Sequence, residues 1–292
     1  MMKGWRTALA AVLALTCVGS ATAQNSEQVE PGQWLSTGRT WDEQRFSPME
    51  QINADNVGQL GLAWYADLSS DRGQEATPLV VGRALYNTEP WNITTAYDAT
   101  SGHVLWRYDP QVPLRFGRMA CCDIVTRGLA AWQDKIILAT LDGRLIALDK
   151  GTGKEVWSTS TVDNSQSYTI TGAPRVYADQ SGRGMIVIGN GGAEMGVRGF
   201  VSAYSADTGK LLWRWHTVPG NPADGFENTA MERAAKTWTG AWWLGGGGGT
   251  AWDSFAFDPA LNLIYVGTGN GSPWAQRWRS PGGGDNLYLA SI

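Results

Sequence analysis

Histidine and cysteine are scarce in this chain of 292 residues. It contains two histidines, His103 and His216, and three cysteines, Cys17, Cys121 and Cys122. Two histidines argue against a histidine-rich zinc or copper site and leave little room for a Ser/His/Asp triad. A basic excess is missing too, because 23 Lys and Arg residues face 27 Asp and Glu residues. The composition therefore speaks against a surface that binds nucleic acid or anionic membranes.

Long apolar runs are also missing, except near the N-terminus. Residues 1–23 carry Lys3 and Arg6, continue with an apolar stretch at 8–18, and end on the small residues Ala21-Thr22-Ala23. This order predicts a secretory signal peptide, which is too short for a membrane-spanning helix. Without it the chain has 21 basic and 27 acidic residues, a net charge of −6. We therefore expect a periplasmic protein without a transmembrane segment, whose mature part covers residues 24–292.

Cys121 and Cys122 are adjacent, and loss of the signal peptide removes Cys17. They can bond to each other, bond to another molecule or remain free. A bond between neighbours closes a strained ring, since disulfides usually join Cα atoms about 4.4–6.8 Å apart and neighbours lie about 3.8 Å apart. Such strain often occurs near functional sites, and an oxidising compartment preserves disulfides. The alternative is two thiols that only pack.

Glycine and tryptophan are abundant, with 37 and 16 copies. Short strands between turn residues predict an all-β fold. A pattern A-x-D-x-x-x-G-x-x-x-W recurs and ends at Trp106, Trp157 and Trp213, with Ser205 replacing the aspartate in the third copy. Spacings of 51 and 56 residues suit one four-stranded β-propeller blade per repeat. Asp and Gly favour the turn, and each tryptophan provides an apolar plate between blades.

The segments outside the repeats also predict local structure. In the leading segment, residues 33–60, Trp34, Trp41 and Phe46 are expected to pack on the blades. We expect a short helix at 230–236 and strands at 254–258 and 286–292. Gly245–Gly249 is read either as a flexible linker or as a place where backbone approaches a ligand. Three repeats with their flanks make about four to five blades, so we expect the front half of a longer propeller.

Polar groups gather in several motifs at strand ends: Gly38-Arg39-Thr40, Gln44-Arg45-Phe46-Ser47-Pro48, Cys121-Cys122-Asp123, Gly192-Ala193-Glu194, Gly196-Val197-Arg198-Gly199, Gly246 to Asp253, and Gly267 to Trp274. These motifs resemble those of the pyrroloquinoline quinone (PQQ)-dependent alcohol dehydrogenases, and most closely their quinohaemoprotein branch. The resemblance covers nearly all of the mature chain. It implies an eight-bladed propeller with the quinone on its axis.

The resemblance also implies roles for individual residues. Cys121 and Cys122 would form a vicinal disulfide on one face of the quinone, and Trp252 would stack on the other. Arg127 would meet a quinone carboxylate and ring oxygen, because its guanidinium is a rigid fork of donors. The other implied contacts to PQQ come from Glu75, Thr171, Gly192, Ala193 and Thr250.

Glu194 and Asn270 resemble the Ca²⁺ ligands of the family, and their hard oxygens suit that ion. The choice between Ca²⁺ and a lanthanide stays open. The family's catalytic aspartate is expected beyond Ile292, so no catalytic residue is assigned, and Asp285 is read as a turn residue. No C-x-x-C-H motif occurs, so haem c is expected only in a C-terminal part. The chain alone is expected to be inactive.

Two functions of different classes follow. The first is oxidation of a small alcohol to an aldehyde with PQQ and Ca²⁺, with electrons passing to cytochrome c. The second is a non-catalytic periplasmic propeller scaffold, which explains the tryptophan repeats. A scaffold has no need for the adjacent cysteines or for Glu194 and Asn270.

Overall fold

The computed structural model describes residues 29–292, and the predicted signal peptide lies outside them. Three four-stranded antiparallel sheets follow one another, each built from consecutive strands. They consist of β1 (Leu79–Val81), β2 (Ala84–Thr88), β3 (Thr94–Asp98) and β4 (Val104–Tyr108); β5 (Ala130–Trp132), β6 (Lys135–Ala139), β7 (Arg144–Asp149) and β8 (Glu155–Ser160); and β9 (Arg175–Ala178), β10 (Gly184–Gly189), β11 (Phe200–Ser205) and β12 (Leu211–His216).

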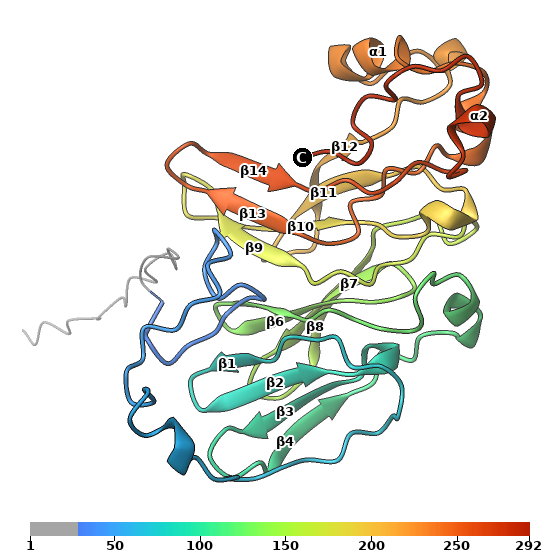
Figure 1. The fold of residues 1–292 in the computed structure, drawn as a ribbon. Coiled ribbons are helices and arrows are strands. Elements are labelled where there is room, and N and C mark those ends of the chain that lie inside the picture. Colours follow the sequence, from blue (N-terminus) through green and yellow to red (C-terminus); the bar gives the residue numbers. More distant parts are fainter. Residues whose placement is uncertain (1–28) are drawn as a thin grey trace, which may run out of the picture.

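A two-stranded sheet, β13 (Phe255–Asp258) and β14 (Leu263–Val266), follows the third full sheet. Figure 1 shows the four sheets stacked in chain order, as consecutive blades of a β-propeller. The all-β propeller fold is therefore confirmed. The described helices are short: α1 (Thr229–Ala235), α2 (Gln276–Arg279) and several 3₁₀ turns.

Apolar side chains fill the spaces between successive blades. One buried cluster joins the first and second sheets, a second joins the second and third, and a third joins β9–β11 to β13. Two of the three repeated tryptophans contribute as predicted: Trp106 belongs to the first cluster, and Trp157 packs against the second. The prediction does not hold for Trp213, which is 37% exposed and belongs to none of these clusters. The turns of the second and third repeats lie opposite the first two indoles, since a Cβ on Gly153 would meet the Trp106 ring and one on Gly209 the Trp157 ring. Each turn is thus closed by the indole of the blade before it.

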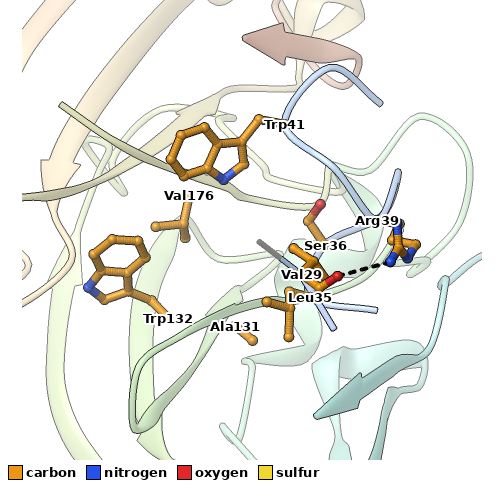
Figure 2. A pocket seen from close by; sticks show the side chains of 8 residues that line it. All are labelled: Val29, Leu35, Ser36, Arg39, Trp41, Ala131, Trp132 and Val176. Atoms are coloured by element: carbon orange, nitrogen blue, oxygen red, sulfur yellow. Dashed lines mark hydrogen bonds between the residues drawn. The ribbon is translucent and has the colours of Figure 1, made fainter. Parts of the chain in front are cut away.

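The leading segment packs against these blades. Trp34 exchanges main-chain hydrogen bonds with Val80 of β1, at 2.8 and 3.0 Å. Figure 2 shows Trp41 near Val176 of β9 and Trp132 of β5, around a cavity of about 20 Å³. Trp34 and Trp41 therefore anchor the segment as expected. The prediction for Phe46 is wrong, because this side chain is 67% exposed.

The strand expected at 254–258 and the helix expected at 230–236 are found, as β13 and α1. The strand expected at 286–292 is wrong, because these residues form turns. The main chain there bends with positive φ at Asn286, Tyr288 and Ala290 and makes turn hydrogen bonds such as Leu289 N to Asn286 O, at 3.1 Å.

Candidate functional site

A cavity of about 180 Å³ lies where the segments before β5, β9 and β13 meet the segments after β10 and β14. It is lined by Cys121, Cys122, Arg127, Thr169, Thr171, Gly191, Gly192, Glu194, Thr250, Trp252 and Asn270. All the site residues predicted from the sequence line it, except Glu75 and Ala193. Residues up to about 150 positions apart are thus gathered on one hollow, as convergence on a propeller axis requires.

Main-chain hydrogen bonds connect the segments that precede the first strand of each blade. Thr77 N donates to Arg127 O at 3.1 Å, and Arg127 N donates to Thr171 O at 3.0 Å. A similar contact joins the third blade to the glycine run, with Gly199 N donating to Gly248 O at 2.8 Å. The main-chain segments around the cavity are therefore held in place by hydrogen bonds to one another.

Arg127 is held from three sides. Nη1 donates to Thr171 Oγ1 at 2.7 Å, and Nη2 lies 2.9 Å from a carboxylate oxygen of Glu75. The guanidinium carbon lies 4.9 Å from the centroid of the Trp252 ring, within the range of a cation–π contact. Glu75 does not line the cavity, and its contact there is with Arg127. The guanidinium is consequently fixed at the cavity wall before any ligand arrives.

Trp252 presents its indole to the cavity and is 45% exposed. Glycines surround its main chain, since a Cβ on Gly172 would collide with Trp252 O. A Cβ on Gly269 would lie 3.3 Å from Cδ1 and Nε1 of the indole. Close backbone approach is a common use of glycine. The neighbouring chain thus supports one edge of the ring and leaves a flat aromatic surface open.

Cys121 and Cys122 are free, exposed thiols in the structure, so the bond between them stays a prediction. Partial burial of the Cys121 sulfur and its hydrogen bond with Cys122 raise the pKa of Cys121 to about 12. The next residue, Asp123, has φ +79° and forms an ion pair with Arg72. Its carboxylate also accepts a hydrogen bond from Ile124 N at 2.7 Å. These contacts fix the turn that carries both cysteines.

Glu194 lies in a 3₁₀ turn, Ala193–Met195, flanked by Gly192 with φ +95° and Gly196 with φ +79°. Ala193 is 2% exposed and packs beneath this turn, so it carries Glu194 without lining the cavity. Within the described residues, the Glu194 carboxylate has neither a hydrogen bond nor an ion pair. Its charge faces the cavity without a partner.

Asn270 Nδ2 donates to Gly271 O at 3.2 Å, which leaves Oδ1 available. A carboxylate and an amide oxygen on one cavity are ligands of the type that Ca²⁺ takes. Residues 29–292 contain no group of three or more His, Cys, Asp or Glu side chains arranged for a metal ion. The assignment of Glu194 and Asn270 as metal ligands stays a prediction.

Thr169 is a lining residue that the sequence reasoning missed. Thr169 and Thr250 are each 2% exposed, and neither hydroxyl has a hydrogen-bond partner among the described side chains and main chain. The signal for Thr169 was its spacing of two from Thr171, which puts both on the same side of an extended segment. Gly191 enters the cavity wall with it, because Gly191 N donates to Thr169 O at 2.7 Å.

Residues 34–292 match the family described as glucose/ethanol/alcohol dehydrogenase, beta-propeller domain, whose label is PQQ. The chain is 59% identical over 276 residues to the quinohemoprotein alcohol dehydrogenase ADH IIB of Pseudomonas putida. The match covers 94% of this chain and 39% of that protein.

Two solved structures are similar. Quinohemoprotein alcohol dehydrogenase ADHIIG of Pseudomonas putida HK5 superposes with a TM-score of 0.85 at 56% identity, over 89% of this chain and 38% of that one. A europium-containing methanol dehydrogenase superposes with a TM-score of 0.77 at 37% identity, over 89% and 46% of the two chains. The chain thus spans less than half the length of these relatives. No helix of the described residues has the length and apolar character needed to cross a bilayer.

Proposed function

The chain belongs to the PQQ-dependent alcohol dehydrogenase β-propeller family, and on this premise we propose that it is the PQQ- and metal-binding part of an alcohol-oxidising enzyme. The observation that carries the proposal is the single cavity that brings Trp252, Arg127, the adjacent cysteines, Glu194 and Asn270 together. The reaction is the oxidation of a small alcohol to an aldehyde. Electrons pass on to a cytochrome c.

The residues present fit a flat, anionic quinone and a hard cation. Trp252 offers an open indole face, and flat aromatic groups stack well on such a surface. Arg127 supplies a fixed positive charge with donors, and the hydroxyls of Thr169 and Thr250 have no hydrogen-bond partners within residues 29–292. The unpaired carboxylate of Glu194 supplies the negative charge that a cation requires.

Each residue then has a distinct task. Trp252 and the Cys121–Cys122 pair, bonded as a disulfide, hold the two faces of the quinone. Arg127 and Thr171 bind its polar edge with Thr250, and Glu75 keeps Arg127 in place. Glu194 and Asn270 hold the cation. Once bound, the quinone supplies a two-electron acceptor and the cation a Lewis acid.

The cation is Ca²⁺ in this proposal. The europium-containing relative shows a lanthanide in one similar protein, so a lanthanide is the alternative occupant. The protein works in the periplasm, after export by the signal peptide predicted at residues 1–23. A purely structural scaffold is the competing function, and it gives no reason for an unpaired Glu194 beside an open tryptophan.

Binding of PQQ to the chain tests the proposed site directly. Adding PQQ with Ca²⁺ should quench tryptophan fluorescence to saturation, and Trp252→Ala should weaken binding about tenfold or more, because stacking on an aromatic ring is lost. Trp274→Ala is the matched control, since Trp274 is 72% exposed and does not line the cavity. Equal loss in both variants would contradict a specific role for Trp252.

The reaction is tested in a protein that continues this chain to the full length of its relatives. After reconstitution with PQQ and Ca²⁺, it should reduce an artificial dye in the presence of a primary alcohol. A folded protein that binds PQQ stoichiometrically and shows no alcohol-dependent reduction would overturn the enzymatic proposal in favour of the scaffold.

A further inference from the structure

The loop that carries Glu194 connects β10 to β11, and its two ends are joined by Asn190. Asn190 is fully buried. Its Oδ1 accepts a hydrogen bond from Phe200 N at 2.8 Å, and its Nδ2 donates to Gly191 O at 3.1 Å. These bonds fix the base of the loop. They do not reach its tip, where Gly192 and Gly196 on either side of Glu194 allow several backbone conformations.

Arg198 attaches the far side of this loop to the segment after β12. Nε donates to Val218 O at 2.7 Å, and Nη1 and Nη2 contact the two carboxylate oxygens of Glu227 at 2.6 and 3.2 Å. Such a two-point contact restricts the orientation of the guanidinium relative to the carboxylate as well as the distance between them. The Arg198 side chain is 21% exposed, and that of Glu227 is 43% exposed. The pair therefore lies at the protein surface, outside the residues that line the cavity.

The main chain of Arg198 also touches the glycine run. Arg198 forms a bridge with Gly248, and Gly199 N donates to Gly248 O at 2.8 Å. Thr217 Oγ1, from the same segment as Val218, donates to Gly249 O at 2.5 Å. Thr250 and Trp252 follow directly. Arg198 thus lies where three segments meet: the loop that carries Glu194, residues 217–227, and the segment that leads from Gly248 to Trp252.

We propose that Arg198 and Glu227 form a latch that positions Glu194 for the metal ion. This inference rests on the proposed metal site and adds two positioning residues to it. The Glu194 carboxylate has no bond of its own within the described residues, so its place depends on how its loop is held. Opening the latch removes the side-chain attachment on the far side of the loop, while the main-chain hydrogen bonds of Gly191 with Thr169 and of Gly199 with Gly248 remain. Glu194 then spreads over more positions, and the metal ion binds less tightly.

Terbium is a suitable probe, because it takes oxygen ligands like Ca²⁺ and its luminescence is excited through a nearby tryptophan. Tb³⁺ is titrated into the chain with one equivalent of PQQ. Glu227→Ala should weaken Tb³⁺ binding about tenfold, the low end of losses seen when residues that orient metal ligands are changed. Glu227→Gln keeps the shape and one acceptor, so its loss should be smaller. Arg198→Ala combined with Glu227→Ala should lose no more than Arg198→Ala alone.

Arg183→Ala is the matched control. Arg183 forms an ion pair with Asp179 at the opposite end of β10, so this variant removes a surface ion pair without touching the Glu194 loop. Its Tb³⁺ affinity should equal that of the unchanged chain. Unfolding temperatures measured without metal separate a general loss of stability from a loss of positioning.

The outcomes distinguish a failure of the latch from a failure of the proposed metal site. If the unchanged chain binds Tb³⁺ and Glu227→Ala binds it equally well, the latch is wrong while the metal site stands. If the unchanged chain and Glu194→Gln bind Tb³⁺ alike or not at all, the metal site itself is wrong, and the latch with it.

Discussion

The residues of the site differ in how many of their hydrogen-bonding and charged groups have partners within the protein. Arg127 has Glu75, Thr171 and Trp252 as partners and is fixed in place. Glu194 faces the same cavity with no partner among the described residues. A group that is already bonded provides a rigid wall, while a charge without a partner is suited to meet a ligand. The site therefore has a preformed part around Arg127 and a part around Glu194 that is free to bind a ligand.

His216 gives a prediction about acid stability. Burial and the positive charges of Arg198 and Arg214 lower its pKa to about 4, although the Glu227 carboxylate opposes the shift. The unfolded chain takes up a proton on this histidine near pH 6.5, and the folded chain does so only near pH 4. The unfolding free energy should therefore fall as the pH drops from about 6.5 to about 4, with no contribution from this group above pH 6.5.

Urea unfolding at several pH values measures this slope. His216→Gln should flatten it in that window, while His103→Gln, which changes the exposed histidine of a turn, should leave it as it is. A slope that survives unchanged in His216→Gln would assign the acid sensitivity to other groups, such as Glu227, whose pKa is also lowered by Arg198.

The glycine run is the element whose role the sequence left undecided. Gly246, Gly247, Gly248 and Gly249 all have φ between +66° and +80°, a conformation that other residues avoid. Their backbones lie against Val197, Trp238 and Asn270 and are hydrogen-bonded. The reading as a flexible linker is wrong, because the run is buried and tightly packed. Its glycines let the chain pass close to Asn270 and deliver Thr250 and Trp252 to the cavity.

Replacing one of these glycines should affect both folding and the metal site. In Gly248→Ala the new Cβ would lie 2.6 Å from Asn270 O and from Ser272 N, with φ +80°. Strain and overpacking together should cost about 3 kcal/mol, and Tb³⁺ should bind less tightly because Asn270 shifts. Gly82→Ala has φ +63° with open space around it, so it should cost only about 1 kcal/mol and leave Tb³⁺ binding intact. Chemical unfolding and Tb³⁺ titration of both variants provide the comparison.

At the scale of the whole molecule, consecutive blades are joined by indoles that close the turns of the next blade. Trp106 Nε1 donates to Lys150 O at 2.9 Å, and Trp64 Nε1 donates to Ala99 O at 3.0 Å. Trp64 is thus an earlier member of the series, which the sequence pattern did not identify. Trp213 is 37% exposed and closes no such turn within residues 29–292.

The same substitution at two equivalent positions should therefore have unequal effects. Trp106→Ala removes a side chain that is 9% exposed and joins two blades, and should lower the unfolding free energy by about 3–5 kcal/mol. Trp213→Ala should lower it by about 1 kcal/mol, because less apolar surface is lost. Urea denaturation of both variants tests this, and similar losses would mean that the blades are not held together by these contacts.

Much of the fold was predictable because its information is local and repeated. Strand alternation and Asp-x-x-x-Gly turns depend on neighbouring residues, so the second blade and its Trp157 were found from the sequence. The strand expected at 286–292 was an apolar-looking segment that its surroundings fold into turns. Phe46 was expected to pack because it is aromatic, but its side chain is largely exposed in the structure.

The site was predictable where a motif resembles one of a known family, as in Cys121-Cys122 or Gly192-Ala193-Glu194. Partners far apart in sequence were not, since no local pattern links Arg198 to Glu227. The expected contact of Glu75 with the quinone stays a prediction, and within the protein Glu75 forms an ion pair with Arg127.

The sequence by itself determined the blade period, the turns and the residue types available for chemistry, because these follow from propensity and spacing. Only the tertiary structure decided which of them meet. Stacking the blades brings Cys121, Thr171, Glu194, Trp252 and Asn270 to one cavity, although up to 149 positions separate them. It also decided that five glycines in a row are packed chain rather than linker. The physical reason is that both outcomes depend on contacts between blades, which become defined only when their faces bury one another.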